Sequence, residues 1–426
     1  MTKVLHLTPH LGGGVGRALS GLIAHANASV AHSIACLEKP EKNQFIESIR
    51  RYGCEVTVSP SMERLEELVR DADILHLEWW NHPATIECLC RLPSLPVRLL
   101  IWSHVSGLYN PIIPPKLILS AHRFIFTSQC SFEAREVADL APQLGERLGV
   151  VSSSGGFAGL PEPQGEAKGG LEVGYIGSLN FAKLHPRYVE FLAGVEIPGF
   201  KVKLIGDLTN RDELNLQCDA FGKHGMLDFR GYTTDIVSEL ASINVLAYLL
   251  NPEHYGTTEN ALLEAMAMGI VPVVLDNMAE RRIVEDRVTG IIVRSPQEFT
   301  KAIEWLSKNP KERASLGIRA AKSVREKFTA ERMEASLNLH YHAVMLQEKR
   351  RVAFTEIFGT NPAQWFLSCQ SSPEIFESDG RISLVPAEMQ SYGLFEKTKG
   401  TVFHFHNYFP NDMKLAQWAK GLETLQ

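Results

Sequence analysis

The chain has 426 residues, of which 45% are apolar and 22% charged, an ordinary globular composition that excludes a disordered or fibrous chain. The length is enough for two or three domains of roughly 100–200 residues each. The 43 Lys and Arg against 49 Asp and Glu give a formal net charge of -6, which argues against a protein that mainly binds nucleic acid.

Nothing in the sequence predicts a secretory leader or a membrane-spanning run of about 18 apolar residues. The seven cysteines are odd in number and scattered, as is typical of free thiols in a reducing compartment. We therefore expect a cytoplasmic protein. Contact with the inner face of the membrane stays open, because Ile112–Leu119 is apolar enough to touch lipid. Packing of this segment in the protein core explains its apolar character about twice as well.

Short apolar runs alternate with amphipathic stretches along the first half of the chain. A turn at Gly12–Gly16 separates the first expected strand from a helical pattern over Arg17–Asn27. The pattern predicts a parallel sheet covered on both faces. The strands expected here are Lys3–Leu7, Ser33–Leu37, Val56–Val58, Ile74–Leu77, Val97–Trp102 and Arg123–Thr127.

The composition changes around Val151–Gly170, where serine, glycine and proline leave little to anchor a core and indicate a linker. The pattern then restarts, with strong helices at Pro296–Ser307 and Lys311–Lys327. The strands expected in this half are Leu171–Ile176, Val202–Ile205, Val245–Leu249, Val271–Leu275 and Gly290–Val293.

The sequence thus predicts an α/β fold of two doubly wound, Rossmann-like domains that face a cleft, residues 1–165 and 171–330. A long helix over 331–350 is expected to cross back to the N-terminal domain. Residues 351–426 hold 12 of the 36 aromatic residues, which predicts a C-terminal extension that packs on the body.

Two glycine-containing loops follow the first strand of each half. Glycines at 12–16 let the backbone approach a ligand, and the helix start favours negative charge, but a plain tight turn stays open. In the loop from Gly177 to Lys183, the ammonium of Lys183 could neutralise phosphate. A solvated surface lysine is the alternative.

The segment from His254 to Gly269 is the most informative. Thr257, Thr258 and Asn260 are good N-cap residues, and Gly269 is a good helix stop. The helix between them is apolar on nearly every side, yet it carries Glu264 in its middle. A buried carboxylate needs donors, which ligand hydroxyls or protein groups could supply.

The histidines and cysteines give weaker evidence for functional or metal-binding sites. His104 follows a strand and precedes a loop, which fits a polar active-site role or a structural one. His404 and His406 would alternate on one strand face, but no third ligand is suggested. Cys88 and Cys90 have no second pair, so we expect no metal site.

The order of these landmarks over residues 1–345 resembles glycosyltransferase family 4, retaining sugar-nucleotide transferases of the GT-B fold. The most specific part is Glu259–Val274, with the core Glu-Ala-Met-Ala-x-Gly-x-x-Pro-Val. Supporting matches are Gly13-Gly14-Val15, His104, Gly177 to Lys183, Leu204 to Asp207, Phe229 to Gly231 and Thr289 to Val293.

The resemblance implies that Lys183 holds phosphate, that Glu264 holds the ribose hydroxyls, and that His104 contacts the donor sugar. It implies a catalytic set of His104, Lys183 and Glu259. The donor-binding residues that it implies are Gly13, Gly14, Ser178, Lys183, Gly256, Thr257, Thr258, Asn260 and Glu264. The co-substrate would be a nucleoside-diphosphate sugar, with no cofactor and no metal, and the acceptor a saccharide, a lipid-linked group or another hydroxyl.

Two departures from the family pattern stand out. Ser178 occupies the position of an arginine, and the first of the family's paired glutamates would fall at Gly256, with Glu259 three residues later. A retaining glycosyltransferase in polysaccharide or glycolipid synthesis is therefore expected. A weakened nucleotide-sugar sensor or scaffold, and a GT-B epimerase, stay open.

Overall fold

The computed structural model describes residues 1–40, 43–163, 169–384 and 392–425, and the predicted boundary at residue 165 lies outside these ranges. The described chain divides into two compact units. Unit 1 consists of Met1–Gly155, Tyr255–Thr258 and Ala330–Gln426, and unit 2 of Gly156–His254 and Glu259–Thr329.

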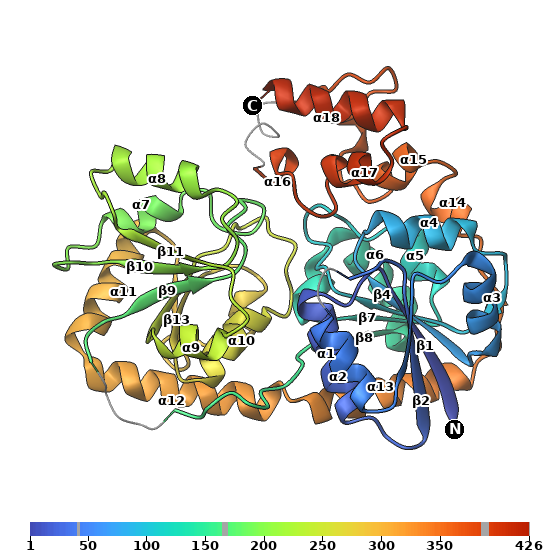
Figure 1. Cartoon of the computed structure of the whole chain (residues 1–426), viewed down its shortest axis with the longest axis horizontal. Helices are drawn as coiled ribbons and strands as arrows, with labels where there is room; N and C mark the ends of the chain where they lie inside the picture. Colours follow the sequence, from blue (N-terminus) through green and yellow to red (C-terminus); the bar gives the residue numbers. More distant parts are fainter. Residues whose placement is uncertain (41–42, 164–168, 385–391, 426) are drawn as a thin grey trace. The chain divides into compact units, whose positions relative to one another are not determined.

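Unit 1 is built on a seven-stranded parallel sheet with the order β3-β2-β1-β4-β6-β7-β8 (Figure 1). A separate antiparallel pair joins β5 to β15. The strands of unit 1 are β1 Thr2–Thr8, β2 Val30–Cys36, β3 Glu55–Val58, β4 Ile74–Trp79, β5 Pro96–Val97, β6 Leu99–Ser103, β7 Arg123–Phe126, β8 Leu148–Val150 and β15 Arg350–Arg351.

Apolar side chains cover both faces of this sheet, because successive residues of a strand point to opposite sides. Along β1, Leu5 and Leu7 join one buried cluster and Val4 joins the other. Helices α1 and α13 pack on the Val4 side. The helices of unit 1 before the extension are α1 Gly13–Ala24, α2 Gln44–Arg51, α3 Met62–Asp71, α4 Pro83–Arg91, α5 Pro115–Ser120, α6 Arg135–Leu144 and α13 Ala330–Met345.

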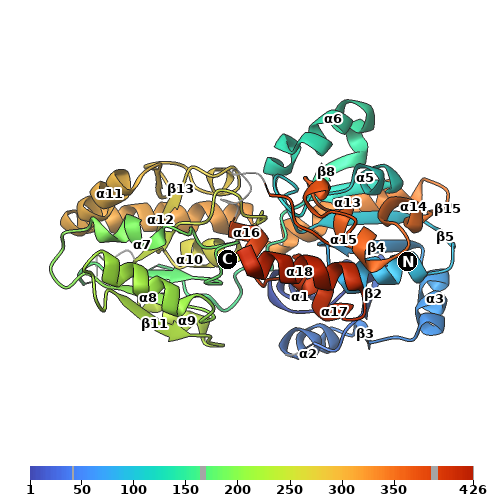
Figure 2. The same ribbon diagram turned by 90° about the horizontal axis from the view of Figure 1, so that it is seen from above.

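The C-terminal extension belongs to unit 1 and lies on the other side of the sheet, against α4 (Figure 1). Trp365, Phe366, Phe405 and Trp418 are buried in the same cluster as Leu77. The extension therefore enlarges a core that α3, α4, α5 and α6 already share with the sheet. Its helices are α14 Phe354–Phe358, α15 Pro362–Leu367, α16 Tyr392–Phe395, α17 Val402–Tyr408 and α18 Met413–Leu425. Figure 2 shows the last two helices of the extension, α17 and α18, side by side.

Unit 2 is built on a six-stranded parallel sheet with the order β11-β10-β9-β12-β13-β14. Its strands are β9 Val173–Ile176, β10 Val202–Ile205, β11 Leu227–Gly231, β12 Val245–Tyr248, β13 Val271–Leu275 and β14 Ile291–Val293. Its helices are α7 Tyr188–Ala193, α8 Arg211–Ala220, α9 Ile236–Ala241, α10 Asn260–Ala267, α11 Pro296–Lys308 and α12 Pro310–Lys327.

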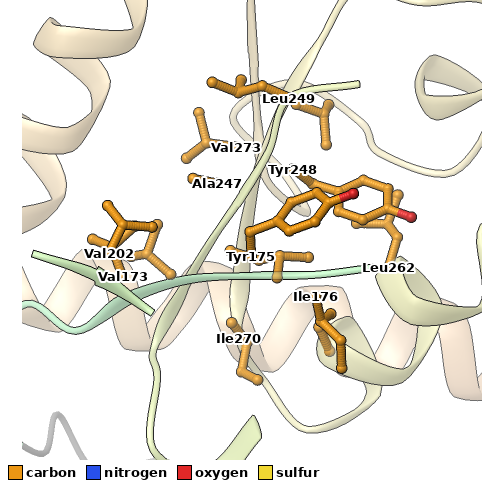
Figure 3. Packing of buried hydrophobic residues seen from close by; sticks show 14 of the residues in the cluster. Val173, Tyr175, Ile176, Val202, Ala247, Tyr248, Leu249, Leu262, Ile270 and Val273 are labelled. Carbon is orange, nitrogen blue, oxygen red and sulfur yellow. The ribbon is translucent and has the colours of Figure 1, made fainter. Parts of the chain in front are cut away.

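The core of unit 2 is a continuous cluster around β9 and β12 (Figure 3). The rings of Tyr175 and Tyr248 stack there with centroids 5.7 Å apart. Helices α10 and α12 pack closely because both backbones carry glycine at the contact. A Cβ on Gly317 would lie 2.0 Å from the carbonyl oxygen of Gly269. The predicted class of two doubly wound α/β sheets is confirmed.

Several sequence predictions are corrected. The glycine segment enters the first helix, so α1 begins at Gly13 rather than at Arg17. His404 lies in helix α17, so the strand expected there is wrong. Among the edge strands of the two large sheets, β3 and β14 were predicted, whereas β8 and β11 were missed, because β8 has only three residues and β11 carries Asp228 and Arg230. Ile112–Leu119 packs in the core through α5, in which Leu117 and Ile118 are buried, as the favoured explanation of this segment predicted.

Among the described residues, no helix combines the length and the apolar character that crossing a bilayer would need. All seven cysteines lie in the described ranges and none forms a disulfide.

Candidate active site

The loop after β9 brings Lys183 to a buried carboxylate of unit 2. The Lys183 Nζ atom lies 2.7 Å from Glu259 Oε2, and the two side chains are 17% and 4% exposed. The backbone holds the loop, since the amide of Asn251 donates to the carbonyl of Lys183. The expected lysine is therefore a fixed ammonium and not a solvated surface group.

Glu259 accepts hydrogen bonds on the oxygen that faces Lys183. Tyr248 donates its hydroxyl to Oε2 at 2.6 Å, and His254 Nδ1 lies 3.9 Å from Oε1. Burial alone would raise the pKa of Glu259, but Lys183, His254 and Tyr248 outweigh burial and lower it. The carboxylate is therefore ionised, and it neutralises Lys183 while no ligand is present.

His254 continues this network to a second buried acid. Its Nε2 lies 3.0 Å from Glu280 Oε1, and Glu280 is fully buried. His254, Glu259 and Glu280 could place ligand atoms within 4.8 Å of one another, as a metal site would require. The imidazole turns its two nitrogens toward different carboxylates, but only Nε2 is within hydrogen-bond distance of its carboxylate, that of Glu280, because Nδ1 lies 3.9 Å from Glu259.

Ser178 joins the loops after β9 and β10. Its hydroxyl donates to Asp207 Oδ2 at 2.6 Å and accepts from Asn180 Nδ2 at 2.6 Å. Burial would raise the pKa of Asp207, but the hydrogen bonds from Ser178 and Thr209 lower it. Asp207 is thus an anion fixed beside the loop of Lys183, which is a feature that the sequence analysis did not assign to the site.

Helix α10 begins one residue after the buried acid. Glu259 occupies the N-cap position without a side-chain cap, so the expected caps at Thr257, Thr258 and Asn260 are wrong, and Asn260 is the first residue of the helix. Glu264 lies in the second turn and is half-buried rather than fully buried. Gly269 has φ +81° and ends the helix, as predicted.

The segment Tyr255–Thr258, including Gly256, packs with unit 1 although its flanking residues belong to unit 2. Thr257 Oγ1 accepts from Thr127 Oγ1 at 2.5 Å, and Thr258 donates to the carbonyl of Thr127 at 2.9 Å. The carbonyl of Tyr255 accepts from the amide of Ser106. This segment therefore lies at the carboxyl ends of β6 and β7, where open α/β sheets bind ligands.

His104 of unit 1 lies at the same edge and meets a buried acid. Its Nε2 atom is 2.7 Å from Glu78 Oε2, and the two side chains are 8% and 0% exposed. Burial would raise the pKa of Glu78, but His76, His104 and His6 together hold it well below its usual value. Glu78 was missed because only its position inside the apolar run of β4 distinguishes it.

Gly13 and Gly14 are exposed at the start of α1. Gly13 has φ +56°, a conformation that favours glycine, and a Cβ there would meet nothing within 4 Å. Among the described residues, no side chain caps this helix start, and no acidic residue lies in its first turn. Anion binding at this loop stays a prediction.

The predicted residues thus fall in two groups. Unit 1 holds Gly13, Gly14, His104, Gly256, Thr257 and Thr258, and unit 2 holds Ser178, Lys183, Glu259, Asn260 and Glu264. In each group the residues lie in loops after the carboxyl ends of parallel strands or in the first two turns of helices α1 and α10, which follow such loops.

These features define a GT-B fold, the fold of a large class of glycosyltransferases. Residues 160–323, which make up most of unit 2, match the family described as Glycosyl transferases group 1. No curated protein sequence matches the chain.

Solved structures of glycosyltransferases share the fold. Anabaena HepE in complex with UDP-glucose is 16% identical with a TM-score of 0.63, over 80% of this chain and 100% of that chain. A complex of S. aureus TarM with UDP, α-GlcNAc-glycerol and fondaparinux is 12% identical with a TM-score of 0.64, over 82% and 100%. Sucrose-phosphate synthase from Thermosynechococcus elongatus is 15% identical with a TM-score of 0.60, over 81% and 99%.

Proposed function

We propose that the protein is a retaining glycosyltransferase that moves a sugar from a nucleoside-diphosphate sugar to a hydroxyl acceptor in polysaccharide or glycolipid synthesis. The observation that carries the proposal is the buried Lys183–Glu259 pair at the carboxyl end of β9, directly before α10. The family match over residues 160–323 and the UDP and UDP-glucose complexes of structures with this fold support the choice of ligand.

The ammonium of Lys183 would stabilise the departing diphosphate, together with the amides at the start of α10. Since Glu259 already accepts a hydrogen bond from Lys183, the diphosphate would share the ammonium with this carboxylate. Glu264 would hold the ribose hydroxyls. In a retaining reaction without an enzymic nucleophile, the leaving phosphate oxygen would take the proton of the acceptor on the same face of the sugar.

The first test is a thermal-shift screen of nucleoside diphosphates. A diphosphate that binds should stabilise the protein by about 2.7 kcal/mol at a concentration one hundred times its dissociation constant. Nucleotide sugars with the same base should then be hydrolysed slowly or transferred. NMR of the product should show the anomeric configuration of the donor, and excess EDTA should leave the rate unchanged if the reaction uses no metal.

Lys183→Ala is the decisive variant, and Lys203→Ala is its matched control. Lys203 also pairs with a glutamate of unit 2, Glu172, at 3.0 Å, but at the amino ends of the strands. We expect Lys183→Ala to lose turnover and most diphosphate affinity while Lys203→Ala keeps both. Equal effects of the two variants would contradict the role of Lys183, and tight binding without turnover over a broad acceptor screen would favour the sensor alternative.

A further inference from the structure

One carboxylate in the middle of unit 1 is surrounded by imidazoles. Glu78 on β4 is fully buried, with His6 Nδ1 at 2.8 Å from Oε1 and His104 Nε2 at 2.7 Å from Oε2. His76 Nε2 lies 3.6 Å from Oε1. The strand register places His6 on β1 directly beside His76 on β4, so both rings point to the same face of the sheet.

The direction of these hydrogen bonds follows from the charge on Glu78. An ionised carboxylate has no proton and can only accept. His6 must therefore carry its hydrogen on Nδ1, and His104 must carry its hydrogen on Nε2. The acid thus selects one tautomer of each ring.

The hydrogen bond between His32 and His6 also runs toward Glu78. His6 Nε2 lies 2.9 Å from His32 Nδ1, and burial lowers the pKa of His32 well below its usual value. His32 Nε2 is buried without a hydrogen-bond partner among the described residues, so the single hydrogen of His32 belongs on Nδ1. His32 then donates to His6, and His6 donates to Glu78.

Tyr341 of α13 lies on the other side of the cluster. Its hydroxyl lies 2.9 Å from His76 Nδ1, and burial keeps that hydroxyl protonated by raising its pKa. His76 Nε2 lies 3.6 Å from Glu78 Oε1 and has no hydrogen-bond partner among the described residues, so Glu78 selects no tautomer of this ring. The histidines that donate to Glu78 are therefore His6 and His104.

His6, His76 and Glu78 could place ligand atoms within 4.8 Å of one another, so a metal is the competing explanation. The 2.8 Å separation of His6 and Glu78 is a hydrogen-bond length, and Glu78 also binds His104, which lies outside that group of three. Hydrogen bonds account for the contacts of His6 and His104 with Glu78 without an ion, whereas His76 Nε2 lies 3.6 Å away and has no hydrogen-bond partner among the described residues.

We infer that Glu78 and His6 are positioning residues, which fix His104 as the Nε2–H tautomer so that its Nδ1 accepts a hydrogen bond from a sugar hydroxyl. His104 is at the ligand-binding edge, since Ser106, two residues on, donates to Tyr255 in the segment before α10. This inference rests on the proposed transferase function. It names the chemistry that the site requires of its sugar, a hydroxyl that donates.

The test compares Glu78→Gln with Glu334→Gln. Glu334 is another buried acid of unit 1 and bonds to the backbone of Asn27, outside the Glu78 cluster. With the donor that the wild-type protein turns over, we expect Glu78→Gln to lower kcat about 10- to 100-fold, as for other residues that orient a functional histidine. The affinity for the nucleoside diphosphate should stay unchanged, and Glu334→Gln should keep its kcat.

Two further measurements separate positioning from a general loss of structure. Nitrogen-15 NMR of the ring of His104 should report the Nε2–H tautomer in the wild type and a mixture in Glu78→Gln. His6→Asn, which keeps a donor near the position of Nδ1, should retain more activity than His6→Leu at equal thermal stability. A wild-type kcat in Glu78→Gln, or an Nδ1–H tautomer in the wild type, would overturn the inference.

The two proposals can fail separately. If no nucleotide sugar is bound or turned over, the proposed function fails, and the NMR measurement still decides the tautomer of His104. If turnover is present in every variant at the same rate, only the positioning role fails.

Discussion

Replacing Glu259 by glutamine tests the buried ion pair of unit 2 most directly. The carboxylate is 3% exposed and accepts charge-assisted hydrogen bonds from Lys183 at 2.7 Å and Tyr248 at 2.6 Å. Removing one charge of a buried pair costs about 3–5 kcal/mol because the other charge stays buried. Since glutamine keeps an acceptor for Tyr248, we expect the lower end, about 3 kcal/mol of unfolding free energy.

Glu259→Gln should have the opposite effect on ligand binding. In the wild type the diphosphate would share Lys183 with Glu259, whereas in the variant Lys183 would lack this carboxylate partner. We expect the dissociation constant of the preferred nucleoside diphosphate to fall about tenfold, or about 1.4 kcal/mol. Saturating diphosphate should therefore recover part of the lost stability.

Urea unfolding with and without diphosphate, and calorimetric titration, measure both effects. Glu172→Gln is the matched control, because its ion pair with Lys203 is largely exposed and should be worth less than about 1 kcal/mol. If Glu259→Gln leaves stability and affinity as they are in the wild type, the carboxylate does not compete for Lys183 and the reasoning is refuted.

Three further predictions concern unit 1 and the helix contact of unit 2. Burial lowers the pKa of His10 and His404 from the ordinary value of 6.5 to about 4. Between pH 6.5 and pH 4, these two histidines are therefore protonated in the unfolded chain but not in the folded protein. Urea unfolding should therefore show stability falling between pH 6.5 and 4 by up to about 1.4 kcal/mol per pH unit for each histidine; a flat profile would contradict it. Gly317→Ala should lower the free energy of unfolding by about 1–3 kcal/mol, measured by thermal unfolding, because its Cβ would lie 2.0 Å from the carbonyl oxygen of Gly269. Trp418→Ala should lower the free energy of unfolding by about 3–5 kcal/mol and expose apolar surface that binds a hydrophobic dye. Unchanged stability of Trp418→Ala would show that the extension adds nothing to the core.

Sequence periodicity was enough to predict the class of fold and most central strands. Buried parallel strands are continuous apolar runs, so β1, β10 and β13 were visible without any partner. The edge strand β14 is also an apolar run and was predicted, but the edge strand β11 lacks that pattern, because it reads Leu-Asp-Phe-Arg-Gly. His404 was placed on a strand because alternating aromatic residues fit both a short strand and a short buried helix.

The sequence predicted single residues of the candidate site, but not which of their side chains contact one another. Lys183 and Glu259 were each expected from motifs, yet they are 76 positions apart and only the fold brings their charges together. Glu78 had no motif at all, and its partner His6 lies 72 positions away. A charged residue inside an otherwise apolar strand is the signal that could have found it, because such a residue needs buried partners.

The extension has a consequence for how the protein is made. Residues 156–329, apart from the four at 255–258, make up all of unit 2, so the ribosome completes that sheet before it reaches the extension. Unit 1 begins first but receives Phe405 and Trp418 only after unit 2 has been made. The part of unit 1 around α4 therefore lacks these aromatic partners until the extension has been synthesised.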